Sequence, residues 1–338
     1  MDSNGWTEVK GKAKKPAAKK DTAPKTNTHA KNAPKGPAAK GSASAGKAPQ
    51  QQLVNGLLPL REWLAEPNRK YRYRKTQHPV EWVEKYRPGG FHPVELGSRL
   101  GLEDQFYVLR KLGHGDRSTT WLVSDDEYVP NSPRDERLAL RILAAEYSGD
   151  LAREGRMRRK LERLDQKSSD RLLVNLYEQF TQAGPNGKHA VGVYEPMGPS
   201  VAQLLQKPKY KSTGIPAVRA RFPPAMAKAV LRQMLEALEL LHYGGIIHGD
   251  VQPSNVLFAL NRKNRSVQDA KEEQLVQPTM GTISKKLTSE AVIAYGKADE
   301  HAPKKVYVAE PLVDYTEPEA EVQVKLGDLS SGKCTFSN

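Results

Sequence analysis

The chain has 338 residues and contains 53 Lys and Arg against 39 Asp and Glu, which gives a formal net charge of +14. Its single cysteine, Cys334, excludes an internal disulfide, and no apolar run approaches the roughly 20 residues that a membrane-spanning helix needs. The N-terminus lacks the apolar segment of a secretory signal. We therefore expect a soluble protein of the cytoplasm, the nucleus or both, without a membrane partner.

The first part of the chain has the composition of a disordered tail. Residues 1–50 contain eleven lysines and three acidic residues among Ala, Pro, Gly and Ser. Such a segment cannot bury enough apolar surface to fold, so we expect 1–52 to be disordered. Its cations could bind polyanions without sequence preference. A solvated linker explains the composition equally well, because aromatic residues, which stack on bases, are nearly absent.

An antiparallel sheet is predicted after a connecting segment at 53–82. That segment contains a short amphipathic helix broken by Pro59 and the basic, aromatic run Tyr71–Lys75. Apolar and polar residues then alternate as in half-buried strands. Strands are expected at 105–112, 119–124, 137–143, 172–180 and 189–195. A helix is expected at 151–164, where apolar residues recur at helical spacing.

The second half of the chain is predicted to be helical and then polar. A helix at 225–241 follows Pro223 and Pro224, and proline is favoured at the start of a helix. Residues 261–321 lose all periodicity, so we interpret them as a polar insert. A final strand within 322–329 presents Asp328. The expected units after the connecting segment are 83–198, 199–260, 261–321 and 322–338.

The segment His248–Phe258 carries the most informative motif. Asp250 and Asn255 lie five positions apart in a loop that enters an apolar run. A carboxylate can accept the proton of a hydroxyl nucleophile while an amide oxygen binds Mg²⁺, and phosphoryl transfer from ATP needs this pair. The segment resembles the catalytic loop of protein kinases. The resemblance implies that Asp250 is the catalytic base, that Asn255 is a metal ligand, and that Gln252, which replaces a lysine, weakens charge stabilisation of the transition state.

A glycine-containing turn precedes this loop by more than a hundred residues. Gly113, Gly115 and Ser118 lie between two expected strands, where little side-chain bulk lets backbone N–H groups approach ATP phosphates. A simple hairpin turn would also contain glycine. The strand with Ala139 and Arg141, about 25 residues further on, favours the nucleotide interpretation.

The resemblance to protein kinases also assigns roles to the third strand. It places Ala139 over the adenine, and it places Arg141 where kinases have a lysine that holds the phosphates and pairs with a glutamate of the next helix. Glu154 is the implied partner. Arginine keeps the charge of lysine, but its planar fork is longer than an ammonium. An ordinary surface contact between the two, worth about 0–1 kcal/mol, is the alternative.

Two further motifs match protein kinases in the right order. Val193–Gly198 resembles the hinge, in which backbone groups of Glu195 to Met197 would bind the adenine edge. Asp328, in the run Gly-Asp-Leu-Ser, matches the metal-binding aspartate. The resemblance therefore implies ATP and Mg²⁺ as cofactors.

Among protein kinases, the chain is most similar to the SR-protein kinases and their fungal relatives. The run Tyr86-Arg-Pro-Gly-Gly-Phe-His-Pro-Val94 resembles the lead-in of that family, and the loop beginning at Gly113 matches theirs, with Ser118 where most kinases have glycine. The resemblance covers about 83–333. It implies an α+β, protein-kinase-like fold with an antiparallel β N-lobe and a helical C-lobe, and transfer of phosphate from ATP to Ser or Thr of a protein substrate, with Arg/Ser-rich proteins as one class.

Two other functions remain open. The chain stops soon after Asp328, so we expect an incomplete C-lobe, and together with Arg141 and Gln252 this favours a pseudokinase that binds nucleotide without transfer. A small-molecule kinase related to the aminoglycoside and choline kinases would also contain His-Gly-Asp and a downstream Asn. The lead-in and the Ser-Thr-Thr-Trp loop favour the protein kinases.

Overall fold

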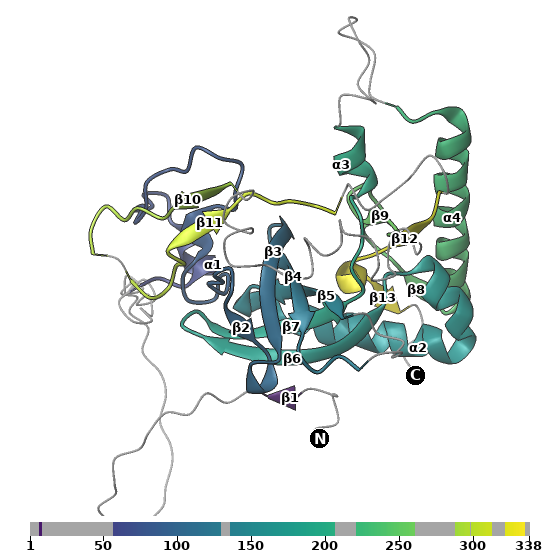
Figure 1. Cartoon of the computed structure of the whole chain (residues 1–338), viewed down its shortest axis with the longest axis horizontal. Coiled ribbons are helices and arrows are strands. Elements are labelled where there is room, and N and C mark those ends of the chain that lie inside the picture. Colours follow the sequence, from purple (N-terminus) through teal and green to yellow (C-terminus); the bar gives the residue numbers. More distant parts are fainter. Residues whose placement is uncertain are drawn as a thin grey trace, which may run out of the picture.

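The computed structural model describes residues 7–8, 57–129, 136–206, 221–260, 288–297, 299–312 and 322–334. The lysine-rich tail apart from 7–8, and residues 261–287, 298 and 313–321 of the predicted polar insert, lie outside these residues. Figure 1 shows a large sheet beside a group of helices and short strands. We call residues 99–197 the sheet lobe, and 198–260 with 322–334 the helical lobe.

The sheet has seven strands in the order β1-β6-β7-β5-β4-β3-β2. Its neighbouring strands are antiparallel except for β1, which runs parallel to β6. The bounds are β1 Thr7–Glu8, β2 Arg99–Leu100, β3 Phe106–His114, β4 Ser118–Asp125, β5 Arg137–Leu143, β6 Leu176–Gly184 and β7 Gly187–Tyr194. The first three strands predicted from the sequence correspond to β3, β4 and β5.

Alternation along β5 assigns its residues to two faces of the sheet. Leu138, Leu140 and Ile142 lie in the main apolar cluster of the sheet, whereas Ala139 and Leu143 belong to a separate cluster. Successive side chains of a strand point to opposite faces. Arg141 is therefore on the same face as Ala139.

Helix α2 spans Ser148–Leu172 and is longer than the predicted helix at 151–164. The strand predicted at 172–180 is wrong at its start, because Leu172 is still helical and β6 begins at Leu176. Neither Gly nor Pro follows Leu164 to stop the helix, so the sequence carried no end signal. A break in the helical geometry does occur at Asp165, with φ −155° and ψ 91°.

The helical lobe contains α3, Val201–Leu205, and α4, Pro224–Tyr243. Helix α4 confirms the helix predicted at 225–241. Two short antiparallel pairs complete the lobe: β9 Val256–Phe258 with β12 Val324–Leu326, and β8 Ile246–Ile247 with β13 Lys333–Cys334. Residues far apart in the sequence are thereby brought side by side.

Part of the predicted polar insert is packed against the sheet lobe. Strands β10, Ser289–Ala291, and β11, Lys305–Tyr307, form a hairpin next to the segment that contains α1, Leu60–Ala65 (Figure 1). Tyr307 contacts Trp121 edge to face, with ring centroids 6.1 Å apart, and Leu312 is buried beside Leu109 and Leu122. These isolated apolar residues gave no periodic signal, so the sequence did not indicate that 288–312 contributes to the core.

Among the described helices, none combines the length and apolarity that crossing a bilayer requires.

Candidate active site

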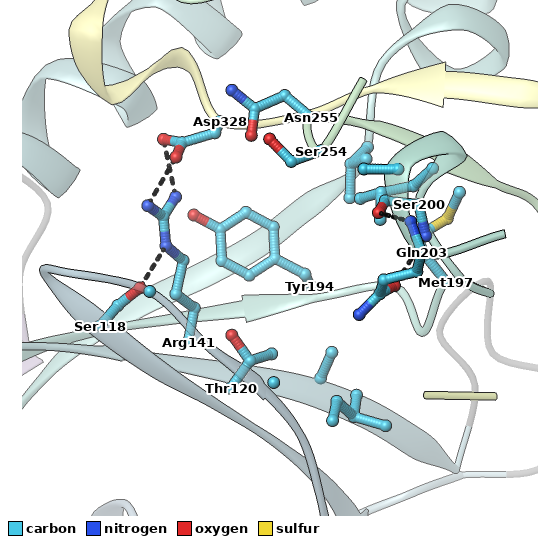
Figure 2. Close-up of a pocket in the computed structure, with 18 of the residues that line it drawn as sticks. Ser118, Thr120, Arg141, Tyr194, Met197, Ser200, Gln203, Ser254, Asn255 and Asp328 are labelled. Atoms are coloured by element: carbon cyan, nitrogen blue, oxygen red, sulfur yellow. Dashed lines mark hydrogen bonds and ion pairs between the residues drawn. The ribbon is translucent and has the colours of Figure 1, made fainter. Parts of the chain in front are cut away.

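A cleft of about 840 Å³ lies between the two lobes. Eleven of the twelve site residues predicted from the sequence line it: Gly113, Gly115, Ser118, Ala139, Arg141, Glu195, Met197, Asp250, Gln252, Asn255 and Asp328. The twelfth, Glu154, is buried on α2 behind Arg141. Segments that are distant in the sequence thus converge on one space (Figure 2).

The glycine-containing turn joins β3 to β4 above this cleft. The Gly115 N–H donates to the Ser118 carbonyl (2.9 Å), which closes the turn. A Cβ placed on Gly113 or Gly115 would meet nothing within 4 Å. The two glycines therefore do not relieve crowding, and they leave the backbone uncovered on the cleft side.

Arg141 makes its main contact with Asp328. Its Nη1 and Nη2 atoms donate to the two carboxylate oxygens at 2.9 and 2.8 Å, and its Nε donates to the Ser118 hydroxyl at 3.2 Å (Figure 2). The Arg141 Nη1 lies 3.7 Å from a Glu154 oxygen. The predicted pair of Arg141 and Glu154 is present, but it is the longer of the two contacts. The sequence did not indicate the pairing with Asp328.

These contacts shift the pKa values of both carboxylates. Burial alone would raise the pKa of Asp328, but the Arg141 guanidinium outweighs burial and lowers the pKa to about 2. For Glu154 the effect of burial exceeds that of the more distant Arg141 charge, so the pKa of Glu154 is raised. Asp328 is therefore a carboxylate at neutral pH.

Backbone geometry fixes the position of Asp328. The residue has φ 59°, in the left-handed region that Asp tolerates better than most residues. Its carboxylate accepts from the Ser330 hydroxyl at 2.5 Å and caps the short 3₁₀ helix Leu329–Ser331. The adjacent Gly327 N–H donates to the Asn255 carbonyl (2.8 Å), because β12 pairs with β9. Asp328 and Asn255 are thus held by neighbouring strand ends.

Two amides hold the Asp250 carboxylate. The Asn255 Nδ2 donates to Asp250 Oδ2 at 3.0 Å and to the Asp250 carbonyl at 2.9 Å. The Gln252 Nε2 donates to the same Oδ2 at 2.8 Å. The Asp250 Oδ1 receives no hydrogen bond from the described residues. The loop therefore fixes one carboxylate oxygen and leaves the other open to the cleft.

The neighbours of Asp250 have structural roles. His248 is buried, its Nε2 lies 2.9 Å from the Gly327 carbonyl, and its Nδ1 accepts from the Asp250 N–H at 3.2 Å. Gly249 has φ +81°, and a Cβ there would lie 2.7 Å from the Ser331 carbonyl oxygen. This close approach explains why glycine stands where protein kinases usually have arginine.

The hinge segment turns the side chain of Glu195 away from the cleft. Its Oε1 accepts from the Asn175 N–H at 2.7 Å and from the Lys325 ammonium at 2.5 Å, and all but 5% of the side chain is buried. The neighbouring Tyr194 is also buried, which raises its pKa well above the usual range. The Glu195 carboxylate is therefore engaged, and the Met197 and Tyr194 side chains line the cleft beside the backbone of the hinge (Figure 2).

The donor set at the bottom of the cleft fits a hard cation. Asp328 offers carboxylate oxygens, and Asn255 uses its nitrogen for Asp250, which leaves its carbonyl oxygen Oδ1. Mg²⁺ prefers such oxygens and usually keeps water or phosphate as its other ligands. No group of three or more His, Cys, Asp or Glu that could hold a metal occurs in the part of the chain that the structure describes. Asp328 and Asn255 are the residues that would hold the ion.

Sequence relatives are kinases. Protein kinase dsk1 of Schizosaccharomyces pombe is 31% identical over 217 residues, 63% of this chain and 37% of the relative. Serine/threonine-protein kinase SKY1 of Saccharomyces cerevisiae is 32% identical over 188 residues (53% and 23%), and human SRSF protein kinase 3 is 30% identical over 179 residues (52% and 29%). The aligned part of the chain is therefore similar to kinases of the SR-protein kinase family. It spans less than two fifths of the length of each of these relatives.

No family model matches the chain. A solved kinase domain aligns with 73% of this chain and 56% of its own length, with 16% identity and a TM-score of 0.44. The α+β fold predicted for an SR-protein kinase, with an antiparallel β N-lobe, is confirmed by the strand order described above. In the terms of this family, the sheet lobe is the N-lobe and the helical lobe belongs to the C-lobe.

Several cleft residues were missed by the sequence analysis. Thr120, Ser200, Gln203 and Ser254 all line the cleft (Figure 2). Ser200 and Gln203 form a reciprocal capping box at the start of α3. The spacing Ser-x-x-Gln before an apolar run is a recognisable signal of that motif. The other two residues have no such signature.

Proposed function

We propose that this chain is an ATP-dependent serine/threonine protein kinase, which transfers the γ-phosphate of ATP to a Ser or Thr hydroxyl. The observation that carries the proposal is the convergence of Asp250, Asn255 and Asp328 on the cleft that also holds the glycine-containing turn and the hinge. Phosphoryl transfer depends on positioning and on electrostatic stabilisation, and these residue types supply both.

The adenine would lie between Ala139 and the hinge. Ala139 is on the cleft face of β5 and is paired in register with Tyr194, the last residue of β7. The Met197 N–H has no backbone hydrogen-bond partner among the described residues. A ligand with a hydrogen-bonding edge, such as adenine, would satisfy this donor.

Asp250 would act on the substrate hydroxyl. Its Oδ2 is held by Asn255 and Gln252, so the carboxylate has a fixed orientation. The other oxygen, Oδ1, is the one that would accept the proton of the hydroxyl. The amide of Gln252 carries no charge, so it supplies less stabilisation of the transferring phosphoryl group than a lysine would.

Arg141 would exchange one anionic partner for another. It now holds the Asp328 carboxylate, and the phosphates of ATP are the competing partner for its guanidinium. The exchange would release Asp328 for Mg²⁺, which in kinases bridges the phosphates and offsets their charge. Before a ligand is bound, Arg141 and Asp328 would therefore remain paired with each other.

A second candidate function is nucleotide binding without transfer. The bidentate contact of Arg141 with Asp328 favours it, because a carboxylate that is neutralised by a guanidinium is a weaker ligand for a metal. Gln252 in place of lysine acts in the same direction. Both functions use the same cleft, and they differ in whether phosphate leaves ATP.

The substrates and partners of this chain are inferred from the family. A protein with Ser or Thr in Arg/Ser-rich segments is the substrate class that we propose, in the cytoplasm or the nucleus. The lysine-rich tail at 1–52 would add sequence-independent binding of polyanions. Deletion of the tail should then weaken nucleic-acid binding and reduce its dependence on salt.

The test of transfer is incorporation of labelled phosphate from Mg·ATP into an Arg/Ser-rich peptide. We expect the wild-type chain to label this peptide and not a version in which every Ser is Ala. The Asp250→Asn variant should not label either peptide. Calorimetry that shows Mg·ATP binding without any labelling would favour the second candidate, and the absence of both would contradict a nucleotide site.

A further inference from the structure

The outer face of α2 carries four cations that have no counter-ion among the described residues. Arg156, Arg159, Lys160 and Arg163, which we call the α2 cationic stripe, fall within an arc of about 100° at 3.6 residues per turn. The three arginines are exposed and the lysine is half-buried. Among the residues that the structure describes, none of the four forms an ion pair or a side-chain hydrogen bond. In Figure 1, α2 runs along the outer edge of the molecule below α4.

The carboxylates of the same helix are engaged elsewhere, so they do not neutralise the stripe. Each has a partner off the stripe: Asp150 pairs with Arg117 and Arg153, Glu154 with Arg141, Glu162 with Arg158, Asp165 with Ser168, and Asp170 with Gln166. The side of α2 that faces solvent is therefore positively charged from Arg156 to Arg163.

Such an arrangement opposes helix formation. Arg156 lies three and four residues before Arg159 and Lys160, and Arg163 lies four and three residues after them. Like charges at these spacings are neighbours on a helix and repel each other. An anion that bound along this face would remove the repulsion, whereas water and salt only screen it.

The composition of the stripe identifies the kind of anion. Met157 and Leu161, the apolar residues between Arg156 and Arg163, are both buried, and the exposed Leu164 lies just past the stripe, so no aromatic or aliphatic anchor lies among the four cations. Protein interfaces and single-stranded nucleic acids need such anchors, for pockets and for base stacking respectively. Binding to a phosphate backbone needs only cations, because release of condensed counter-ions supplies the free energy. Arginine in addition contacts phosphate through two parallel hydrogen bonds.

We propose that the α2 cationic stripe binds the phosphate backbone of double-stranded nucleic acid. From Arg156 to Arg163 the helix rises about 10 Å, a length that faces several phosphates of a duplex. The contact involves no base edges, so duplex RNA and duplex DNA would both be bound through their phosphates. The opposite side of α2 carries Glu154, which contacts Arg141 in the cleft, so one helix serves both surfaces.

The test is fluorescence anisotropy of the full chain with a labelled duplex of about 20 bp, in RNA and DNA forms, at about 50 and about 200 mM salt. The stripe variant is Arg156→Glu with Arg159→Glu and Arg163→Glu. The matched control, Arg61→Glu with Lys228→Glu and Lys304→Glu, changes the net charge equally at exposed positions on other elements. The lysine-rich tail is present in all three proteins, so its contribution is common to them.

We expect the stripe variant to bind at least about tenfold more weakly than the control at low salt, and with a smaller salt dependence, because contacts to about three phosphates are lost. Tighter binding of either the RNA or the DNA form would identify the preferred source of the phosphates. The Arg→Gln triple variant guards against misfolding, since Gln is a good helix former, and it should lose affinity while circular dichroism stays unchanged.

Equal affinities of the stripe variant and the control would overturn the proposal and leave a solvated helix face. A loss that is confined to an acidic peptide or to anionic vesicles, with duplex binding intact, would also overturn it.

Discussion

Arg141 holds Asp328 through two parallel hydrogen bonds of 2.9 and 2.8 Å, which join β5 of the N-lobe to the loop after β12. The two side chains are only 18% and 28% exposed. Without a ligand, the residue that we propose to hold phosphate therefore neutralises the residue that we propose to hold the metal. The affinity of the cleft for Mg·ATP would then depend on the strength of this pair.

Arg141→Lys should increase Mg²⁺-dependent ATP binding. An ammonium cannot form the two parallel bonds, so it holds Asp328 less tightly while it still attracts phosphate. We expect an increase on the order of tenfold, which corresponds to about 1.4 kcal/mol. Calorimetric titration measures it, and Arg110→Lys on β3, outside the cleft, is the control. An unchanged affinity would show that the pair does not oppose binding.

Asp250→Asn and Gln252→Lys should change turnover in opposite directions. The first variant loses the proposed proton acceptor, and we expect turnover to fall by about 10²–10⁴-fold with ATP affinity unchanged.

Gln252→Lys supplies a positive charge next to Asp250 and should raise turnover. Gln206→Lys adds the same charge at the rim of the cleft and is the control. If the two lysine variants have equal rates, Gln252 does not limit transfer.

Glu195 and Lys325 form a buried ion pair that stabilises the hinge. Their side chains are 5% and 8% exposed, so removal of either partner takes away a counter-ion that lies 2.5 Å from a buried charge. We expect Glu195→Gln to lower the free energy of unfolding by about 3–5 kcal/mol. The double variant with Lys325→Met should be less destabilised than Glu195→Gln alone. Urea unfolding of the wild type, Glu195→Gln, Lys325→Met and the double variant measures these values, and a double variant whose destabilisation equals the sum of the two single effects would contradict the coupling.

The stability of the protein should fall below about pH 6.5 because of two buried histidines. His92 and His189 contact each other edge to face with ring centroids 4.9 Å apart, and burial lowers their pKa values to about 3 and about 4. The unfolded chain binds protons at pH 5 that the folded protein excludes. The stabilisation is therefore complete above the unfolded pKa and is lost as the pH falls toward the folded values, by about 2 kcal/mol per histidine between pH 7 and pH 5.

His92→Phe tests this pH dependence. The variant has one fewer buried titrating group, so the fall in unfolding free energy between pH 7 and pH 5 should be about half as large. Replacing the exposed His78 by Phe should leave the fall unchanged. If His92→Phe has the same pH profile as the wild type, His92 is protonated in the folded protein.

Local patterns predicted the parts of the fold that depend on nearby residues. Strand β5 was predicted with its observed bounds, Arg137–Leu143, because its alternation is regular and both faces are covered. Helix α4 was predicted nearly as well, since Pro224 marks its start and its apolar stripe is broad. The end of α2 was missed because its last turns are polar and carry no stop signal.

Contacts between distant segments could not be predicted in this way. Asp328 reaches Arg141 because β12 pairs with β9 across a long stretch of sequence, and no spacing rule specifies that pairing. Tyr307 and Leu312 are single apolar residues in a polar region, and their burial depends on the N-lobe surface that they cover. Sequence motifs therefore predicted which residues line the cleft, and the structure was needed to see which of them bind each other.

Calorimetry with Asp328→Ala tests most directly whether the cleft is an Mg·ATP site. We predict that the wild-type chain binds ATP much more tightly with Mg²⁺ than with a chelator, because in the proposed site Asp328 and Asn255 would supply ligands of the ion. Asp328→Ala should abolish this difference, while Asp116→Ala, at the rim of the same cleft, should retain it. The cleft is not an Mg·ATP site if the folded wild-type protein binds ATP equally well with Mg²⁺ and with the chelator, and if Asp328→Ala has the same affinities as the wild type.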